Sequence, residues 1–374
     1  MKMIKVLSVF GTRPEAIKMC PLVKEMELCS EMESVVCITA QHRQMLDQVL
    51  EVFEIRPDYD LNVMSRCQTL FDITAKVICG LKEVLEDSHP DIVLVHGDTT
   101  TSFAAALAAF YCRIPVGHVE AGLRTYDKYS PFPEEMNRTL TGDIAELHFS
   151  PTTQNKDNLL CENIQKNIFV TGNTVIDAFK TTVRDTYVFE NEALNTLPFG
   201  EKRFVLMTAH RRENLGKPLE NICKAVLRLA EKYTDIHFVY PVHLNPAVRK
   251  TVFAYLDGKK NITLLDPVSV ADMHNMMARS FLVMTDSGGL QEEAPYFGIP
   301  VLVMRTETER PEAVEMGTVR VVGVKEEDIV AAAEHLINDA TEYDKMAQAV
   351  NPYGDGHASE RIIDAILKWA KEEK

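Results

Sequence analysis

The sequence predicts an α/β fold made of two doubly wound parallel-sheet domains. Its 374 residues are enough for about two domains of roughly 150 residues each. Short apolar runs alternate with helical stretches over the whole length, which is typical of repeated strand–helix–strand units. Most of these runs lack polar alternation, as expected for strands buried on both faces of a parallel sheet.

The apolar runs divide evenly between the two halves, so the halves are alike in architecture, although no sequence repeat relates them. In the first half, the predicted strands are 4–10, 35–40, 91–96, 116–120, 147–150 and 168–171. In the second half, the predicted strands are 204–208, 237–242, 262–265, 281–285, 300–304 and 318–322. Two amphipathic helices are predicted after the last strand, at 326–338 and 358–371.

The predicted linker lies near 172–200, where the apolar periodicity weakens. We therefore expect an N-terminal domain over 1–172, a C-terminal domain over 173–350 and a last helical segment over 351–374. A turn-rich stretch at 351–356 separates the last helix from the preceding one. The amphipathic pattern alone does not decide which domain this last helix packs against.

The composition is that of an ordinary folded protein, with 46% hydrophobic and 25% charged residues. The 40 basic and 55 acidic residues leave a net charge of −15, which disfavours nucleic acid and anionic membranes as partners. We expect no signal peptide, and no apolar run approaches the ~20 residues that span a bilayer. The eight cysteines form no C-x-x-C pair, which is typical of reduced thiols, so we expect a cytoplasmic protein.

The turn after the first predicted strand carries two cations. In open α/β sheets, ligands bind beyond the carboxyl ends of the strands. Gly11 permits a tight turn and Pro14 suits a first helical turn, so Arg13 falls at a helix start. Lys18 follows about one turn later, and the two cations predict an anion site. The alternative is a routine turn with solvated charges, because cations there oppose the helix dipole.

Three carboxylates form a second candidate group. Asp98 follows the strand at 91–96, Glu120 follows the next strand directly, and Glu134 lies in an acidic first helical turn. At one edge of a sheet they would crowd together and raise one another's pKa, which provides an acid or base near neutral pH. The alternative for Asp98 is a simple helix cap.

The second half has two further candidates. His210 lies where the strand at 204–208 runs into a loop, and a structural role is the alternative to a catalytic one. Ser287, Gly288 and Gly289 follow the strand at 281–285 and open a helix, so their N–H groups suit a phosphate.

Two charged residues accompany that turn. Glu293 lies just over one turn into the helix, where its carboxylate can accept hydrogen bonds from a ribose diol. Arg310 is a later cationic partner for an anion. The alternative is a plain Ser-Gly-Gly turn with Glu293 in solvent.

Several cofactor motifs are absent from the sequence. No G-x-G-x-x-G follows a predicted strand and no G-x-x-x-x-G-K-[ST] occurs, so neither a dinucleotide redox cofactor nor a P-loop is expected. HExxH and His/Cys clusters with metal spacing are also absent, so no metal is expected.

Eight motifs resemble those of the bacterial non-hydrolysing UDP-N-acetylglucosamine 2-epimerases. In chain order they are FGTRPEAIK, HGDTTTSFAAALAAF, GHVEAGLRT, PFPEEMNR, TAHRREN, TDSGGLQEEA, RTETERPEA and NPYGDGHAS. The resemblance implies a two-domain GT-B fold, a C-terminal helix that crosses back to the first domain, and a homodimer. It also implies reversible C2 epimerisation of UDP-GlcNAc to UDP-ManNAc, without NAD or metal, through loss of UDP to 2-acetamidoglucal and re-addition. The product would supply ManNAc for cell-surface polysaccharides.

The resemblance also implies roles for the residues that match its motifs. The catalytic group comprises Asp98, Glu120, Glu134 and His210, with the histidine near the leaving diphosphate. The contacts to the UDP-sugar comprise Arg13, Lys18, Ser287, Gly288, Gly289, Glu293 and Arg310. A second, activating UDP-GlcNAc site has the motif positions Gln41, Gln44, Arg211 and His243.

Two positions depart from the family pattern. Cys67 occupies the place that commonly holds an arginine before Gln-Thr-Leu, with Arg66 one residue earlier, and a missing guanidinium weakens a diphosphate site. The expectation of activation is weakened accordingly. Met273 lies where the family often has aromatic residues near the uracil, and a thioether replaces an aromatic face less rigidly.

Three other functions are compatible with parts of the pattern. A hydrolysing epimerase and a GT-B glycosyltransferase share the Ser-Gly-Gly-Leu-x-Glu-Glu region, but the three carboxylates with His210 favour the non-hydrolysing epimerase. A nucleotide-sugar sensor without turnover is the third, and the intact carboxylates argue against it.

Overall fold

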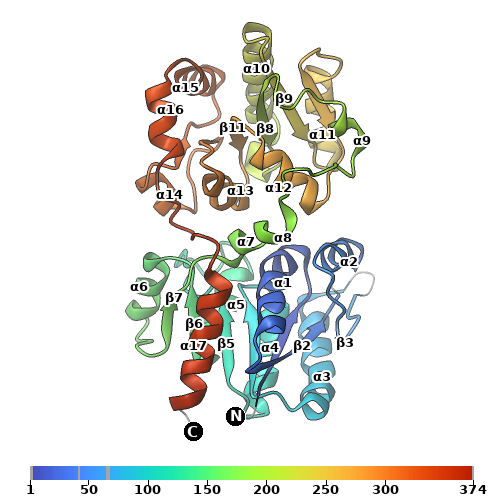
Figure 1. The fold of residues 1–374 in the computed structure, drawn as a ribbon, viewed down its shortest axis with the longest axis vertical. Coiled ribbons are helices and arrows are strands. Elements are labelled where there is room, and N and C mark those ends of the chain that lie inside the picture. Colours follow the sequence, from blue (N-terminus) through green and yellow to red (C-terminus); the bar gives the residue numbers. More distant parts are fainter. Residues whose placement is uncertain (1–2, 41–42, 65–67, 373–374) are drawn as a thin grey trace. The chain divides into compact units, whose positions relative to one another are not determined.

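The chain folds as two units, each built around one parallel sheet (Figure 1). The computed structural model describes residues 3–40, 43–64 and 68–372. Unit 1 comprises Met1–Thr181 with Tyr353–Lys374, and unit 2 comprises Thr182–Pro352. The division therefore falls after Thr181, later in the chain than position 172.

Unit 1 has a seven-stranded parallel sheet in the order β3-β2-β1-β4-β5-β6-β7. Its strands are β1 (Ile4–Phe10), β2 (Met32–Ile38), β3 (Tyr59–Asp60), β4 (Ile92–His96), β5 (Val116–Val119), β6 (Leu147–Ser150) and β7 (Ile168–Val170). Six of them coincide with or overlap predicted strands. The apolar pattern does not predict β3, because this edge strand has only two residues and neither is aliphatic.

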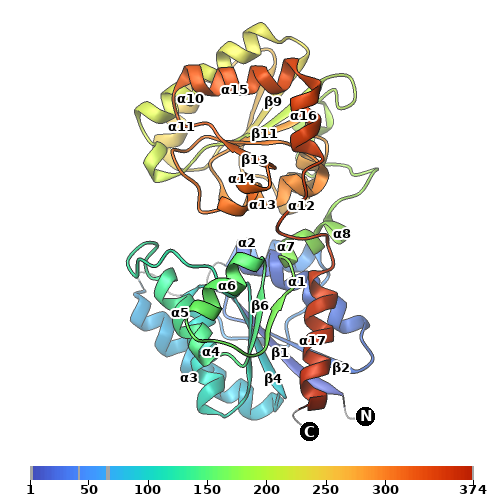
Figure 2. The ribbon, with the colours of Figure 1, turned by 90° about the vertical axis from the view of Figure 1, so that its left-hand side faces the viewer.

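Helices cover both faces of this sheet (Figure 2). They are α1 (Arg13–Leu28), α2 (Arg43–Val52), α3 (Leu70–Ser88), α4 (Thr100–Tyr111), α5 (Glu134–Ile144), α6 (Thr153–Cys161), α7 (Thr174–Asp177), α8 (Phe179–Thr182, across the division) and α17 (Ala358–Glu372). Strand β4 is buried along its whole length, and Val93 and Val95 pack in one core with Val77 of α3. Burial on both faces explains why these strands are continuous apolar runs.

Unit 2 has a six-stranded parallel sheet in the order β10-β9-β8-β11-β12-β13. Its strands are β8 (Arg203–Thr208), β9 (Ile236–Pro241), β10 (Ile262–Leu265), β11 (Leu282–Thr285), β12 (Val301–Val303) and β13 (Val319–Val321). All six coincide with predicted strands to within one or two residues at the ends. The prediction of two doubly wound parallel sheets is therefore confirmed.

The helices of unit 2 surround this second sheet. They are α9 (Glu192–Asn195), η1 (Arg212–Asn214), α10 (Lys217–Lys232), α11 (Pro246–Leu256), α12 (Val270–Ala278), α13 (Gly288–Glu293), η2 (Ala294–Phe297), α14 (Pro311–Glu315), α15 (Glu326–Asn338) and α16 (Ala340–Ala347). The predicted helix at 326–338 coincides with α15. Helix α16 is not predicted, because it follows α15 directly and Asp339 ends one helix and caps the other, accepting from Thr341 N at 3.0 Å.

The last helix, α17, belongs to unit 1, where it packs beside α1 (Figure 1). Its first turn is held by the buried Asp177 of α7, which accepts hydrogen bonds from Ser359 N at 2.8 Å and Ala358 N at 3.2 Å. Burial raises the pKa of Asp177, although these donors partly offset the effect. Asn173 N donates to Tyr353 O at 2.7 Å. These contacts explain why residues 173–181 fold with unit 1.

The strand orders decide where functional side chains can gather. In each unit the order reverses at one point, between β1 and β4 in unit 1 and between β8 and β11 in unit 2. Loops at the carboxyl ends of such strands form the usual ligand site of a doubly wound sheet. Within the described residues, no helix is long and apolar enough to cross a membrane.

Candidate functional site

The turn from β1 into α1 is held by Glu15, a buried carboxylate that the sequence motifs do not single out. Its Oε2 accepts from the backbone N–H groups of Gly11 at 3.0 Å and Thr12 at 2.7 Å, and Thr12 caps α1. Its Oε1 accepts from Thr99 Oγ1 at 2.6 Å, in the turn after β4. Arg13, the first residue of α1, therefore begins its helix at the carboxyl end of β1, one of the two strands between which the strand order reverses.

Gly11 is required here by space rather than by backbone conformation. A Cβ at this position would lie 1.8 Å from Thr39 Oγ1, far inside van der Waals contact. Thr39 is itself buried and lies 3.2 Å, oxygen to oxygen, from Thr101 of α4. The segments after β1 and β2 and the first turn of α4 therefore approach closely at this point, and any side chain at position 11 would require Thr39 to move.

Glu120 follows β5 and is the centre of a buried charge cluster. Its carboxylate lies 2.8 and 2.6 Å from Lys18 Nζ and 2.7 Å from His96 Nε2, the last residue of β4. Burial alone would raise the pKa of Glu120, but the Lys18 ammonium and His96 outweigh it and hold the pKa well below its ordinary value. The backbone of Glu120 is left-handed, with φ of 63°, so this position is strained for a residue with a Cβ.

The expectation that crowded carboxylates raise one another's pKa is therefore wrong for Glu120. The sequence places Asp98 and Glu134 as its neighbours, but the tertiary structure places an ammonium group and an imidazole closer. Lys18, predicted from the sequence to contact an anion, balances the charge of Glu120 in this structure.

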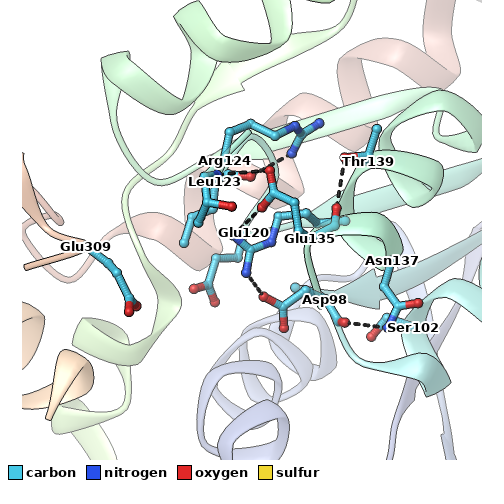
Figure 3. A network of polar contacts seen from close by, with 12 residues as sticks. Asp98, Ser102, Glu120, Leu123, Arg124, Glu135, Asn137, Thr139 and Glu309 are labelled. Carbon is cyan, nitrogen blue, oxygen red and sulfur yellow. Dashed lines mark hydrogen bonds and ion pairs between the residues drawn. The ribbon is translucent and has the colours of Figure 1, made fainter. Parts of the chain in front are cut away.

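Asp98 lies in the turn after β4 and is paired with Arg138 of α5. Asn137, the residue before Arg138 in α5, donates to Asp98 O at 3.0 Å (Figure 3). Helix α5 therefore contacts both the side chain and the backbone of Asp98. Glu134 begins α5, one helical turn before Arg138 and therefore on the same face of the helix. The carboxylates Asp98, Glu120 and Glu134 thus all lie at the carboxyl edge of the sheet of unit 1.

Glu135 and Arg124 shape the loop between Glu120 and α5 (Figure 3). The buried Glu135 accepts from Thr125 N at 2.9 Å and Tyr126 N at 2.8 Å. Arg124 forms a two-point ion pair with Glu162, with both N···O distances at 2.7 Å, and its side chain is only 1% exposed. Both residues belong to recognised motifs, yet both hold the loop rather than face the surface.

In unit 2, Asp286 holds the loop that carries His210. Its Oδ2 accepts from the backbone N–H groups of His210 and Arg211, both at 2.8 Å, and from Asn214 Nδ2 at 2.9 Å. Its Oδ1 is buried and has no hydrogen-bond partner among the described residues. Asp286 lies within the motif TDSGGLQEEA, but the motif by itself indicates no role for this residue. The signal that would find it is its place directly after β11, beside the end of β8.

His210 stacks on His243, with ring centroids 5.3 Å apart and an angle of 30° between the rings. Burial lowers the pKa of His210, the Asp286 carboxylate raises it, and the charges of His243 and Arg211 lower it again. The result is a pKa below the usual value, which favours a neutral imidazole near pH 7.

Two guanidinium groups border the start of α13. A Cβ on Gly288 would lie 3.6 Å from Arg211 Nη2 and 3.7 Å from Arg310 Nη2. The N–H groups of Gly288 and Gly289 belong to the first helical turn, where amides have no partner within the helix. The N–H of Ser287 donates instead to Thr285 Oγ1 at 2.9 Å. Arg211, predicted for a second site, therefore lies beside Gly288 with Arg310.

Glu293 and Met273 lie on neighbouring elements of unit 2. Glu293 Oε2 is 3.6 Å from His274 Nε2, and Glu293 Oε1 would be 3.0 Å from a Cβ on Gly289. His274 is buried and its Nδ1 lies 2.8 Å from Thr182 Oγ1. Met273, the residue before it on α12, is half-buried. The carboxylate of Glu293 is thus fixed close to the glycines that open α13.

Of the other residues predicted for a second site, the structure describes His243 but not all of the rest. Gln41, the side chain of Gln44, and Cys67 with its neighbour Arg66 lie outside the described residues. His243 is exposed and its Nδ1 accepts from Asn245 N at 3.1 Å. Among residues 3–40, 43–64 and 68–372, no three or more His, Cys, Asp or Glu side chains are grouped to hold a metal ion.

Comparison with known proteins gives a consistent result over nearly the whole chain. The family model described as UDP-N-acetylglucosamine 2-epimerase matches residues 24–367. The UDP-N-acetylglucosamine 2-epimerase of Bacillus subtilis is 57% identical over 98% of this chain and 96% of its own length. The crystal structure of the Neisseria meningitidis UDP-GlcNAc 2-epimerase bound to UDP-GlcNAc is 51% identical, covers 98% of this chain and 100% of its own, and has a TM-score of 0.88. A kitacinnamycin glycosyltransferase, 12% identical with a TM-score of 0.68, shares the fold alone.

Asp286→Ala removes the acceptor of three hydrogen bonds, so we expect it to lower the free energy of unfolding by about 3 kcal/mol, at roughly 1 kcal/mol for each bond. Asp286→Asn keeps an oxygen acceptor and should lose less. Urea unfolding followed by circular dichroism measures both changes. The control is Asp235→Asn, which alters an exposed carboxylate paired with Arg203 at 2.7 Å. A loss for Asp286→Ala no larger than that of the control would contradict the role given to Asp286.

Proposed function

The chain belongs to the UDP-N-acetylglucosamine 2-epimerase family, and from this premise we propose that it interconverts UDP-N-acetylglucosamine and UDP-N-acetylmannosamine without hydrolysis. The reaction inverts C2 of the sugar, whose proton is not acidic because no carbonyl carbon adjoins it. If the C1–O bond to UDP breaks, positive character at C1 acidifies the C2 proton. Loss of that proton leaves 2-acetamidoglucal and UDP. Return of a proton to the opposite face of C2, with UDP rejoining C1, gives the epimer.

The pairing of the Glu120 carboxylate with Lys18 and His96 is the observation that carries this proposal. A group that accepts a proton from carbon must be deprotonated before the reaction, and Lys18 and His96 keep Glu120 in that form. Asp98 and Glu134 lie at the same edge of the sheet, so we assign the proton transfers at C2 to the three carboxylates as a set. The product would supply N-acetylmannosamine units for polysaccharides.

The diphosphate is the second part of the proposal. We assign its binding to Arg13, Arg310 and the amides at the start of α13, because guanidinium and helix N–H groups both suit phosphate oxygens. Glu293 is assigned to the ribose diol and Met273 to the uracil. His210, half-buried and held by Asp286, is assigned to the leaving diphosphate oxygen.

Neither a nicotinamide nor a metal is part of the proposed reaction. Transient oxidation of a neighbouring carbon would be the other way to acidify C2, and it requires a dinucleotide. No G-x-G-x-x-G follows a strand in this sequence, so elimination is the route that the motifs support. The hydrolysing epimerase and the glycosyltransferase remain as alternatives to be separated by experiment.

Incubation of UDP-GlcNAc with the purified protein in D₂O, without NAD, metal or acceptor, tests the reaction by NMR. We expect UDP-ManNAc with deuterium at C2. Accumulating free ManNAc would show hydrolysis instead, and the absence of both product and exchange would overturn either epimerase. Asp98→Asn, Glu120→Gln and Glu134→Gln should each lower kcat by ~10²–10⁴-fold. The surface control Asp235→Asn should not.

We propose in addition that UDP-GlcNAc activates the enzyme at a second position that includes Arg211 and His243. His243 stacks on His210, and Arg211 shares with His210 the hydrogen bonds to Asp286. A ligand on these two residues would therefore act directly on the loop that carries His210.

UDP-ManNAc alone should consequently be turned over slowly until a little UDP-GlcNAc is added. Initial rates with and without added UDP-GlcNAc measure this, and equal rates would refute activation. Cys67→Arg, which restores the family's arginine, should lower the concentration of UDP-GlcNAc that gives half-activation. His243→Ala should remove the dependence.

We further propose a homodimer that forms at the opposite edge of the sheet of unit 1. There a cavity of about 560 Å³ is lined by Phe110 and Tyr111 of α4, which are 58% and 67% exposed, and by Arg113 and Glu146. Exposed aromatic side chains around a hollow mark an interaction surface. A two-fold axis would set Arg113 of each copy against Glu146 of the other, so the surface is self-complementary.

Sedimentation velocity should give the mass of two chains for the wild type and of one chain for Tyr111→Glu or Phe110→Glu. The matched control is Val350→Glu, which alters a side chain 69% exposed in unit 2. A wild type that sediments as one chain at micromolar concentration would rule out the dimer.

A further inference from the structure

We propose that His96 and His118, two buried histidines on neighbouring strands, are positioning residues in a crosswise arrangement, in which each contacts the turn that follows the adjacent strand. Each holds the turn that follows the other's strand, and each of these turns carries one of the carboxylates assigned to the reaction. His96 ends β4 and contacts Glu120, which follows β5. His118 lies in β5 and contacts Gly97, which follows β4 and precedes Asp98.

The contact of His118 is a buried hydrogen bond to backbone. Its Nε2 lies 2.7 Å from Gly97 O, and a carbonyl oxygen only accepts, so Nε2 carries the proton. Gly97 has a left-handed backbone with φ of 61°, so its turn has a conformation that an ordinary residue disfavours. Burial lowers the pKa of His118 to about 3. The ring is therefore neutral when it donates from Nε2 to Gly97 O.

The contact of His96 is with the carboxylate itself. Its Nε2 lies 2.7 Å from Glu120 Oε2, and two atoms that both lacked a proton would repel at that distance. This nitrogen is buried and makes no aligned hydrogen bond among the described residues, so its interaction with Glu120 is a close contact set by distance. Glu120 also has a left-handed backbone, so each of these two turns has one residue in the left-handed region and is contacted by a histidine from the adjacent strand.

The two histidines differ from Lys18 in how firmly their polar atoms are positioned. Lys18 also contacts Glu120, but its ammonium is at the end of a flexible chain on a helix. His96 and His118 have short side chains on paired central strands, with the register His96–Val119 and Val95–His118. The positions of both rings are therefore set by the pairing of β4 with β5 and not by a long flexible side chain. This geometry fixes the separation of the two turns before any ligand is bound.

The imidazole rings of His96 and His118 are unusual at these buried positions, because the surrounding strand residues are apolar. Val93, Val95 and Val119 are all buried around them. A leucine of similar size would bury well but would leave Gly97 O without its donor and Glu120 without one of its two partners. His148 of β6, the register partner of His118, is buried too. Among the described residues no hydrogen bond or ion pair joins its side chain to Gly97 or to Glu120, so it provides a control on a neighbouring strand.

Hydrogen–deuterium exchange tests the crosswise arrangement without reference to activity. We expect His96→Leu to speed amide exchange in residues 120–126 and His118→Leu to speed it in residues 97–99, each across the strand pair. His148→Leu should change neither segment. Faster exchange in both segments for every variant, or in neither for His96→Leu and His118→Leu, would overturn the inference. If a leucine variant does not fold, His96→Gln and His118→Gln give the same comparison in weaker form.

The kinetic part of the test rests on the proposed epimerase reaction. His96→Leu and His118→Leu should lower kcat by about 10²-fold with KM nearly unchanged, the size expected when reacting groups are misplaced by about 1 Å. The glutamine variants, which keep a side-chain N–H donor, should recover much of kcat, and His148→Leu should resemble the wild type. Equal losses for leucine and glutamine would overturn the kinetic role. A wild type without C2 exchange would refute the proposed function, whereas the exchange pattern would still decide the crosswise contacts.

Discussion

The buried carboxylate of Glu120 is the constraint around which unit 1 is arranged. An ionised carboxylate in a protein interior is costly unless it is paired, and removing one partner of such a pair costs about 3–5 kcal/mol. Its partners come from separate elements, Lys18 from α1 and His96 from β4, so the ion pair ties a helix and two strands together. The same contacts keep the carboxylate deprotonated. Loss of Lys18 or His96 should therefore lower the stability of unit 1 and raise the pKa of Glu120 together.

In unit 2 a buried carboxylate, that of Asp286, is stabilised by hydrogen bonds in place of a cation. Asp286 lies fully buried after β11, and three N–H donors converge on one of its oxygens. Two of these donors are the backbone N–H groups of His210 and Arg211, so Asp286 sets the course of the loop that bears both residues. Both units thus place an acidic residue directly after a strand of the sheet, Glu120 after β5 and Asp286 after β11, and in both that residue organises the groups around it.

The net charge of −15 is compatible with an anionic ligand because the cations are placed locally. Arg211 and Arg310 lie beside Gly288, and Arg13 lies at the start of α1. An acidic exterior weakens long-range attraction of anions, whereas a pair of guanidinium groups and helix amides acts at contact distance. The global charge disfavours polyanions as partners, whereas it leaves room for a single nucleotide diphosphate at a local cluster of cations.

The sequence by itself determined the fold class and the family. Apolar runs of strand length mark all six strands of unit 2 and six of the seven in unit 1, because burial on both faces requires a continuous apolar run whichever strands become neighbours. The short motifs located Asp98, Glu120, Glu134, His210 and the turn at Gly288, because turns after strands use distinctive residues. Only the tertiary structure decided how these groups are held and charged. The lowered pKa of Glu120, the hold of Asp286 on His210 and the contacts of His96 and His118 all join residues far apart in the chain or on adjacent strands. Such contacts depend on which strands become neighbours, and no local pattern of residues records that.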